Sequence, residues 1–425
     1  MMTKEISPSG KVSGKVILPG SKSMTHRALL MAALASEPSI VDGALVAEDT
    51  MLTAQALERL GVNLRREKTT WFVSPPKWRW KRCDSPIFLK NSGTSMRLLL
   101  GIAAAGKGRF IFDGTERMRQ RPVGPVVEAL SVLGVKCNFL IRHGYPPVEI
   151  ISNGLGNGGT VEIRVDARKS SQFLSSLLIA SPCAKGTVRL SWLEPIASYP
   201  YVEMTLRMMR EREIHFRWLG DSEIEIPGGQ DYRGGRWTVE GDCSTASYFW
   251  AAAAITGGTI ETEPVFEESY QGDAGLLEIL ERMGCRVERR GNIVAVSGSR
   301  RLRGVDVDMN SMPDMVPTLA VVAAFAEGDT IIRNVGHLRI KESDRLKAVS
   351  TELKKMGAHV EIRGDDLVIR GGEKLHGAEI DTYDDHRIAM AFAVAGLRVP
   401  GVVIRNPGVV SKSFPEFWEV FGSLT

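Results

Sequence analysis

The sequence repeats one pattern of residues about every 74 positions, and this repeat constrains the fold more than any other feature. In five places an amphipathic helical segment is followed by a turn and then by residues typical of a strand. Four of the five segments carry Gly at the helix end, where a left-handed residue caps a helix. The last apolar residues of the segments, at spacings of 73, 76, 74 and 73, are Leu60, Leu133, Met209, Met283 and Met356. The pattern predicts amphipathic helices over residues 54–60, 125–133, 205–209, 276–283 and 350–356, and a truncated sixth copy that ends near Phe421.

A second type of helix recurs between the first ones and is apolar on nearly every face, which is typical of a buried helix. These helices are predicted over residues 23–35, 93–105, 170–180, 244–255, 314–326 and 385–397. Most amphipathic helices are followed by a hairpin of alternating residues, such as 359–370 with its Gly364-Asp365 turn. We therefore predict an α/β protein of six β-α-β-α-β-β repeats, with buried helices and outer sheets. The 425 residues supply two or three domains' worth of core, so three repeats are assigned to each of two domains.

The buried helices begin with small polar residues, and several have a cation in or just before the first turn. These cations are Lys22, Arg27, Arg97, Lys169 and Arg387. A helix N-terminus binds phosphate or carboxylate readily, because its N–H groups are unpaired and carry partial positive charge. The Ser and Asp residues there are equally explained as helix N-caps. If the helices point toward one gap, their ends are expected to bind anions together.

Composition excludes several classes of protein. The 54 Lys and Arg against 50 Asp and Glu give a charge of +4, too balanced for a protein that coats nucleic acid. The longest apolar run, residues 315–326, contains Pro317 and is too short to span a membrane. Five cysteines without a CxxC pair and seven dispersed histidines indicate no disulfide framework and no structural metal. The first 15 residues have no apolar segment of a signal peptide, so a cytoplasmic location is expected.

Two motifs are given little functional weight. Residues 154–159 match GxGxxG by letter, but they lie between two strand-like runs and are expected to form a loop. Residues 77–82 alternate aromatic and cationic side chains, as a nucleic-acid platform does, but are expected to be an outer strand or loop.

Four segments of the first half contain candidate anion or polyol ligands. Lys22, Ser23 and Arg27 lie around one helix start, and Gly93 at the next start lets a ligand approach the backbone. Arg121 belongs to a loop with three Arg in five residues, for which a solvated basic loop is the alternative. Two further helix-start and turn segments supply Ser170, Ser171, Gln172, Ser198 and Tyr201.

The second half contains the candidates for proton transfer. Residues 339–345 form a dense cluster of alternating charge, with Glu342 between Lys341 and Arg345. A carboxylate beside cations can alternate between acid and base, although a surface salt-bridge network has the same appearance. Asp314 places a second carboxylate at a buried helix start, and Arg387 and Lys412 add cations.

At these residues the chain resembles the 5-enolpyruvylshikimate-3-phosphate synthase family, from about Ser9 to Phe417. The motifs that carry the resemblance, in family order, are LPGSKSMTHR, NSGTSMR, RQRP, SSQFLSSLL, SYPYVEMT, EGDCSTASY, IKESDRL, TYDDHR and SKSFPEF. The resemblance implies two domains, residues 1–21 plus 241–425 and residues 22–240, with the active site in the cleft between them. It also implies transfer of the enolpyruvyl group of phosphoenolpyruvate to the 5-hydroxyl of shikimate 3-phosphate, with release of phosphate through a tetrahedral intermediate. A cytoplasmic monomer without metal or organic cofactor, acting on two small anions, is expected.

The resemblance also implies a role for each candidate. Shikimate 3-phosphate is expected to contact Ser23, Arg27, Ser170, Ser171, Ser198, Tyr201, Asp314, Lys341 and, at a position where many relatives have Asn, His337. Phosphoenolpyruvate is expected to contact Lys22, Gly93, Arg121, Gln172, Arg345, Arg387 and Lys412. Asp314 is expected to take the hydroxyl proton and Glu342 to handle the proton on carbon 3, with Lys22 assisting. The family is the target of the inhibitor glyphosate, and the retained Gly93 favours sensitivity, whereas Leu98 and the pair Thr25-His26 depart from many relatives.

Two other functions fit less well. The sister family that transfers enolpyruvate to UDP-N-acetylglucosamine commonly has a Cys in the loop matching residues 115–121 and a Lys-Asn pair near the first helix. Here the loop has no Cys, and Lys22 is followed by Ser23. A non-catalytic anion-binding repeat protein is expected to have lost Asp314, Glu342 or Lys22, and all three are present.

Overall fold

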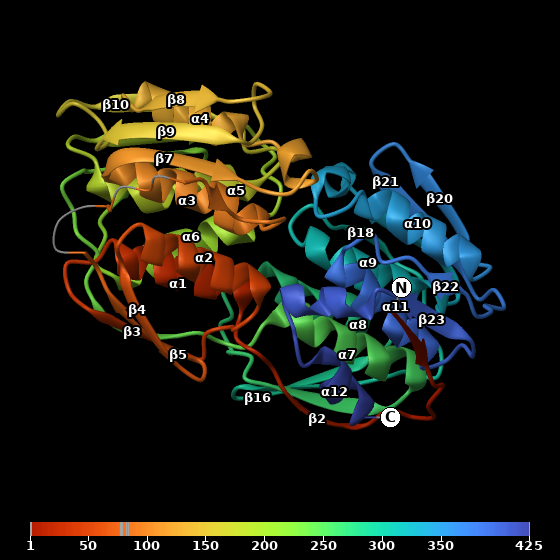
Figure 1. The fold of residues 1–425 in the computed structure, drawn as a ribbon. Helices are drawn as coiled ribbons and strands as arrows, with labels where there is room; N and C mark the ends of the chain where they lie inside the picture. Colours follow the sequence, from red (N-terminus) through yellow and green to blue (C-terminus); the bar gives the residue numbers. More distant parts are fainter. Residues whose placement is uncertain (1, 77–79, 82, 84, 425) are drawn as a thin grey trace. The chain divides into compact units, whose positions relative to one another are not determined.

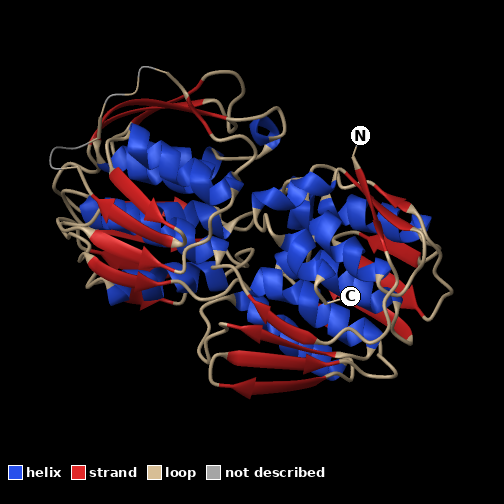
Figure 2. Ribbon diagram, turned by 60° about the horizontal axis from the view of Figure 1, so that its bottom comes forward, coloured by secondary structure: helices blue, strands red, loops and turns tan. Residues whose placement is uncertain are grey.

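The protein, described here by a computed structural model, is an α/β chain that divides into two compact units (Figure 1). Unit 1 consists of Met1–Ser21 and Glu240–Thr425, and unit 2 of Lys22–Val239. The structure describes residues 2–76, 80–81, 83 and 85–424. Within this part, each unit contains three small sheets, and its apolar helices lie inside them (Figure 2).

Six helices with mainly buried side chains form the interior, as the sequence predicts. They are α1 (Lys22–Ala33), α3 (Gly93–Ala105) and α5 (Ser171–Ala180) in unit 2, and α7 (Cys243–Thr256), α9 (Val316–Ala324) and α11 (His386–Gly396) in unit 1. The helix predicted from residue 314 instead opens with a 3-10 turn, η4 (Pro313–Met315), and becomes α-helical at Val316. Proline has no N–H to donate, and Pro317 is accommodated in the first turn of α9, where intrahelical donors are not required.

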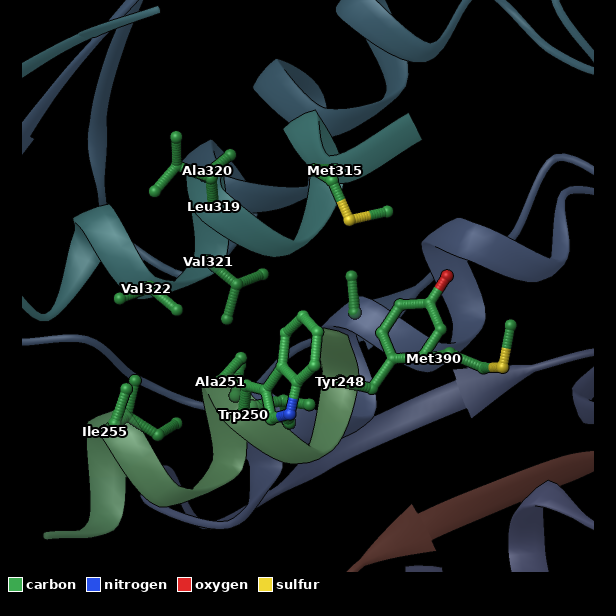
Figure 3. Packing of buried hydrophobic residues seen from close by; sticks show 14 of the residues in the cluster. Tyr248, Trp250, Ala251, Ile255, Met315, Leu319, Ala320, Val321, Val322 and Met390 are labelled. Atoms are coloured by element: carbon green, nitrogen blue, oxygen red, sulfur yellow. The ribbon is translucent and has the colours of Figure 1, made fainter. Parts of the chain in front are cut away.

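Side chains from neighbouring buried helices interlock in the core of unit 1 (Figure 3). Trp250 of α7 is fully buried and points toward α9, and its indole N–H donates to Thr262 Oγ1 at 2.9 Å. A buried indole nitrogen needs such an acceptor, because an unpaired donor in the interior costs about 1–3 kcal/mol. This core fixes the positions of the helix N-termini in unit 1.

The outer sheets repeat one strand order. Five of the sheets in the described part have four strands, and each begins with a parallel pair and continues with an antiparallel hairpin. In unit 2 the orders are β6 (Ile87–Phe88)-β7 (Lys107–Asp113)-β9 (Val148–Asn153)-β8 (Lys136–Phe139), β10 (Val161–Val165)-β11 (Val188–Trp192)-β13 (Glu223–Ile226)-β12 (Arg217–Gly220), and β14 (Gly235–Thr238)-β3 (Ser39–Asp42)-β5 (Thr70–Ser74)-β4 (Asn63–Glu67). In unit 1 they are β2 (Gly14–Ile17)-β15 (Thr259–Glu263)-β17 (Ile293–Ser297)-β16 (Arg286–Arg290) and β18 (Asp306–Asp308)-β19 (Gly328–Arg333)-β21 (Asp366–Gly371)-β20 (His359–Arg363).

The sixth sheet is the truncated copy. Its strands are β22 (Glu379–Ile380), β23 (Val402–Arg405) and β1 (Thr3–Ile6), so the first strand of the chain takes the third place. The copy ends with α12 (Phe417–Gly422), and the predicted end near Phe421 is confirmed.

Five amphipathic helices precede the hairpins and end in the same way. They are α2 (Glu48–Arg59), α4 (Gly124–Val132), α6 (Pro200–Glu211), α8 (Leu276–Arg282) and α10 (Arg345–Lys355). Each is closed by two backbone bonds of the Schellman type, for example Gly61 N–H to Glu58 C=O and Val62 N–H to Leu57 C=O in α2. Four of the left-handed residues are glycines, as predicted, and the fifth is Glu213, with φ 62°.

The two places where the chain passes from one unit to the other are paired within unit 1. Gly20 and Gly241 form an antiparallel bridge, the N–H of Ser21 donates to the C=O of Glu240 at 2.7 Å, and that of Asp242 to Pro19 at 2.9 Å. Gly241 has no room for a side chain, since a Cβ would lie 2.3 Å from the carbonyl oxygen of Pro264. The crossing segments are therefore a fixed part of unit 1.

The two motifs given little weight have separate outcomes. Residues 154–159 form the predicted loop between β9 and β10, so no helix follows the glycines. Of the 77–82 segment, residues 77–79 and 82 lie outside the described residues. No helix in the described part of the chain is both long and apolar enough to cross a membrane.

Candidate active site

The candidate residues form two clusters, one in each unit. We call the set in unit 2 the helix-start cluster; its members are Lys22, Ser23, Arg27, Gly93, Arg121, Ser170, Ser171, Gln172, Ser198 and Tyr201. We call the set in unit 1 the arginine–carboxylate cluster; its members are Asp314, His337, Lys341, Glu342, Arg345, Arg387 and Lys412.

In the helix-start cluster, Gln172 links the first turns of two buried helices. Its Oε1 accepts from Arg97 Nη1 at 2.8 Å, and its Nε2 donates to Thr94 Oγ1 at 2.9 Å, which ties α5 to α3. Ser170 caps α5, since its Oγ accepts from the Gln172 N–H at 3.3 Å. The N-cap interpretation is therefore correct for Ser170, and the N–H of Phe173 in the same turn donates to the Ser170 oxygen at 3.3 Å.

Arg121 packs against the start of α3. Its Nη1 donates to the backbone oxygen of Asn91 at 2.9 Å and to Asn91 Oδ1 at 3.1 Å, and its side chain is buried. A Cβ on Gly93 would lie 2.4 Å from Arg121 Nη2. The absence of a side chain at Gly93 thus lets the guanidinium lie against the helix N-terminus, where positive charge accumulates.

Lys22 is the first residue of α1, and its Nζ lies 3.3 Å from Asp49 Oδ2 of α2. The two side chains are 12% and 2% exposed. A charge so poorly hydrated requires a partner, and Asp49 supplies it. The sequence analysis did not select Asp49, although its place in the first turn of a helix gave a signal.

Arg27 is buried and joins three helices. Its Nε donates to Thr205 Oγ1 at 2.7 Å, and its Nη2 to Ser175 Oγ at 3.2 Å and to the backbone oxygen of Tyr201 at 3.1 Å. Burial lowers the pKa of Arg27 to about 10, although the neighbouring Tyr201 opposes this. The Arg27 guanidinium remains cationic at neutral pH and holds α1 against α5 and α6.

Ser198 and Ser171 are brought together by a backbone bond, because the N–H of Ser171 donates to the Ala197 oxygen at 3.2 Å. Ser198 adopts a left-handed conformation with φ 61°, and its C=O accepts from the Tyr201 N–H at 3.1 Å. The hydroxyl-rich segment before α6 therefore lies beside the start of α5.

The departures Thr25 and His26 have structural partners. Thr25 Oγ1 accepts from the Leu45 N–H at 2.9 Å. His26 Nδ1 lies 2.8 Å from Thr53 Oγ1, which lies 2.8 Å from Ser95 Oγ. This buried chain of polar groups fixes α1 against α2 and α3.

In the arginine–carboxylate cluster, Arg345 is bonded to three carboxylates. Its Nη1 donates to Asp314 Oδ1 at 2.7 Å, its Nη2 to Glu342 Oε2 at 2.6 Å, and its Nε to Asp385 Oδ2 at 2.7 Å. The Arg345 side chain is 1% exposed. Burial by itself lowers the pKa of Arg345, but Asp385, Glu342 and Asp314 outweigh burial and raise it.

Asp314 is shared between two guanidinium groups, since Arg387 Nη2 donates to its Oδ2 at 2.7 Å. Burial raises the pKa of Asp314, but the charges of Arg387, Lys341 and Arg345 dominate and hold it well below its usual range. Asp314 is consequently an ionised acceptor at neutral pH.

Asp385 organises this cluster from the N-cap of α11. It accepts from the Arg387 N–H at 3.0 Å and from Ser343 Oγ at 3.0 Å, as well as from Arg345. The sequence analysis named Asp385 only as a helix start beside cations. An Asp directly before an apolar helix is an N-cap signal, but its pairing with Arg345 joins residues 40 positions apart.

Of the remaining members, His337 and Lys412 lie on short 3-10 helices, and Lys341 directly follows one of them. His337 belongs to η5 (Gly336–Ile340), next to Lys341, and Lys412 is buried at the end of η6 (Pro407–Lys412). Burial, together with the charge of Lys341, lowers the pKa of His337 to about 3, against the opposing effects of Asp314 and Asp308. In the described part of the chain, no three His, Cys, Asp or Glu side chains are grouped to hold a metal ion.

The chain is similar to proteins of one family over nearly its whole length. Residues 6–421 match the model of the family described as EPSP synthase (3-phosphoshikimate 1-carboxyvinyltransferase). The chain is 54% identical to a 3-phosphoshikimate 1-carboxyvinyltransferase of Syntrophobacter fumaroxidans, over all of both chains. It is 41% identical to one of Vibrio vulnificus, over 100% of this chain and 99% of the other. A solved EPSP synthase of Acinetobacter baumannii has a TM-score of 0.83 at 30% identity and covers 99% of this chain and 98% of its own.

Proposed function

The chain belongs to the EPSP synthase family, and from this premise we propose how its residues divide the work of the reaction. The enzyme transfers the enolpyruvyl group of phosphoenolpyruvate to shikimate 3-phosphate, in the shikimate pathway. Units 1 and 2 are proposed to be the family's two domains, residues 1–21 plus 241–425 and 22–240, with the reactants bound by both clusters. We further propose a cytoplasmic monomer.

The helix-start cluster is proposed to supply most of the anion-binding groups. Shikimate 3-phosphate is assigned to Ser23, Arg27, Ser170, Ser171, Ser198 and Tyr201, together with Asp314, His337 and Lys341 of unit 1. Phosphoenolpyruvate is assigned to Lys22, Gly93, Arg121 and Gln172, together with Arg345, Arg387 and Lys412. Charge-assisted bonds from guanidinium groups and helix N–H groups support this division, because both reactants carry several negative charges.

The observation that carries the proposal is the sharing of Arg345 and Arg387 between carboxylates. In the protein without substrate, these cations make Asp314 a weak base. When the anionic groups of phosphoenolpyruvate bind the same cations, part of the positive charge is withdrawn from Asp314. Its pKa then rises, and Asp314 becomes able to accept the proton of the 5-hydroxyl.

The proposed reaction is an addition followed by an elimination. In the addition, Asp314 takes the 5-hydroxyl proton, the hydroxyl oxygen bonds to carbon 2 of the enol, and Glu342 gives a proton to carbon 3. In the elimination, Glu342 takes a proton back from carbon 3, and the bond between carbon 2 and the phosphate oxygen breaks. Asp314 returns its proton to the departing phosphate. Lys22 stabilises negative charge on the phosphate, and the protons balance over the two steps.

The first test replaces the two proposed proton-transfer groups without changing their size. Asp314→Asn and Glu342→Gln are each expected to lower kcat by about 10²–10⁴-fold, the usual contribution of a general acid or base. Phosphate release is measured with phosphoenolpyruvate and either shikimate 3-phosphate or UDP-N-acetylglucosamine. Activity of the unaltered enzyme with the nucleotide sugar would contradict the assigned acceptor, and near-normal kcat in both folded variants would refute the two roles.

A further inference from the structure

A second buried carboxylate is connected to Arg387 through one hydroxyl group. Asp273 lies in η3 (Gly272–Gly275) and is 1% exposed, and Ser244 lies in the first turn of α7 and is 7% exposed. Ser244 Oγ is hydrogen-bonded to Asp273 Oδ2. Arg387 Nη2 donates to Ser244 Oγ at 3.3 Å and also to Asp314 Oδ2 at 2.7 Å. A line of polar contacts therefore runs from Asp273 to Asp314.

The direction of these bonds follows from the chemistry of the groups. A guanidinium can only donate, so Ser244 Oγ accepts from Arg387. The single hydroxyl proton of Ser244 is then directed to Asp273. Negative charge on Asp273 makes the serine oxygen a better acceptor, so the carboxylate strengthens the hold on Arg387.

The charges around Asp273 make its ionisation sensitive to pH near neutrality. Burial is the main cause that raises its pKa to about 6; Asp314 and Asp242 act in the same direction, while Arg387 and the Ser244 hydroxyl oppose them. Cys243, the first residue of α7, is also close enough to be affected by the Asp273 charge. These groups come from the starts of α7, η4 and α11. The helices α7 and α8 (Leu276–Arg282) pack against η3, and the charged residues of α8 are Glu278, Glu281 and Arg282.

We propose that Asp273 and Ser244 are positioning residues that hold the Arg387 guanidinium in place for phosphoenolpyruvate. This inference rests on the assignment of Arg387 to that substrate. Neither residue needs to touch a substrate, because each acts through Arg387. Loss of the hydroxyl removes one acceptor of the Arg387 guanidinium while its bond to Asp314 remains, so the cation is expected to shift toward that carboxylate.

Ser244→Ala tests the hydroxyl, with Ser247→Ala as the matched control. Ser247 is one turn further along α7 and is also buried, and its hydroxyl donates to the Ser244 backbone oxygen at 2.6 Å. Ser244→Ala is expected to raise KM for phosphoenolpyruvate about 5–10-fold, with less than about a 2-fold change in KM for shikimate 3-phosphate. Ser247→Ala is expected to leave both KM values within about 2-fold. Equal effects of the two variants would indicate loss of packing and overturn the proposal.

Asp273→Asn tests the charge through its dependence on pH. The ratio of variant to unaltered KM for phosphoenolpyruvate is used, because titration of the substrate cancels in this ratio. Above pH 7, where Asp273 is ionised in the unaltered enzyme, the ratio is expected to be about 3–10; below pH 5.5, where Asp273 is protonated, it is expected to approach 1. A ratio that is constant from pH 5 to 8 would contradict the role of the charge.

Coupling to Arg387 separates positioning from a general effect on folding. In an Arg387→Lys background, Ser244→Ala is expected to change KM for phosphoenolpyruvate by less than about 2-fold, because the group on which it acts is gone. Additive effects would overturn the proposal. If the unaltered enzyme released no phosphate from its two substrates, the proposed function itself would fail; an active enzyme with unaffected variants would reject only this inference.

Discussion

Arg345 is the residue at which three carboxylates of unit 1 meet. One guanidinium satisfies Asp314, Glu342 and Asp385 at 2.6–2.7 Å, and these bonds account for its buried position. Breaking a buried ion pair by removing one partner costs about 3–5 kcal/mol, because the remaining charge is left uncompensated. Arg345 therefore supports the fold of unit 1 as well as the proposed binding of phosphoenolpyruvate.

Sequence reasoning selected Asp314, Glu342, Arg345 and Arg387, but not the residues that connect them. Glu342 and Arg345 are only three positions apart, but Glu342 lies in the turn before α10, ahead of its N-cap Asp344, so helical spacing does not predict their pairing. Asp385 contacts Arg345, 40 positions away in the chain, and Asp273 is connected to Arg387 through Ser244, which is 143 positions from Arg387. Contacts over such separations cannot be predicted from local spacing. The resemblance supplied the candidates for substrate contact, but the carboxylates that support them, Asp273 and Asp385, could be identified only from the structure.

His337 provides a prediction about stability and pH. Burial, with the nearby Lys341 charge, lowers its pKa from 6.5 to about 3, so the folded protein holds this side chain neutral. Between pH 6.5 and 3 the unfolded chain binds a proton that the folded chain does not, and stability is lost as pH falls through this window. His337→Asn is expected to remove this loss, so that the variant gains about 2 kcal/mol relative to the unaltered protein between pH 7 and pH 5.

Urea denaturation at the two pH values measures this difference. The unaltered protein, measured at the same two pH values, is the reference for this difference. A relative gain of zero for His337→Asn would mean that His337 is protonated in the folded state at pH 5.

The ends of the amphipathic helices repeat one cap with one exception. In α6 the N–H of Ile214 donates to Met209 and that of Glu213 to Arg210, both at 3.1 Å, as in the glycine-capped helices. Glu213 must adopt φ 62° to make these bonds, a conformation that is unfavourable for a residue with a Cβ. The same cap therefore forms at the end of α6 although its left-handed position is occupied by Glu213 instead of glycine.

Glu213→Gly is expected to raise the free energy of unfolding by about 0.5–1 kcal/mol, because glycine adopts the left-handed conformation without steric cost. The exposed ion pair with Arg233 is lost, but pairs of this kind contribute little. Glu213→Ala removes the same ion pair and keeps the strain, so it should give no gain. Chemical denaturation compares the three proteins, and equal stability of the Gly and Ala variants would exclude the backbone explanation.

At the scale of elements, the helices were predictable and the sheet partners were not. The period of about 74 residues located the amphipathic and buried helices, because helical periodicity is local. The sequence did not predict that β3 pairs with β14 or that β15 pairs with β2, because the strands of each pair are almost 200 or more residues apart in the chain. Strand pairing at that separation depends on the complete fold.

At the scale of the whole molecule, unit 2 is inserted in the sequence between the two segments of unit 1. Unit 2 is a continuous segment, Lys22–Val239, and the ends of unit 1 that flank it are already bonded, with Ser21 N–H 2.7 Å from the Glu240 oxygen. A chain in which Ser21 is joined to Glu240 by a short glycine-rich linker is expected to fold alone, since its three sheets and three buried helices are all retained.

Circular dichroism and urea denaturation test this expectation. The joined chain should unfold in one cooperative transition. A control consisting of residues 240–425 lacks β1 and β2, which complete two of its sheets, and should show a weaker transition or none. A joined chain without cooperative unfolding would mean that unit 1 needs unit 2 for stability.

The pairing of β1 with β23 also sets an order of events during synthesis. Thr3 lies opposite Arg405, so β1 is synthesised long before β23, and their sheet cannot form until β23 has been made. All of Lys22–Val239 emerges in that interval and is free to acquire its structure. The nascent chain is thus expected to contain a folded unit 2 while the two segments of unit 1 are still unpaired. Unit 1 can fold only when residues 240–425 have been synthesised.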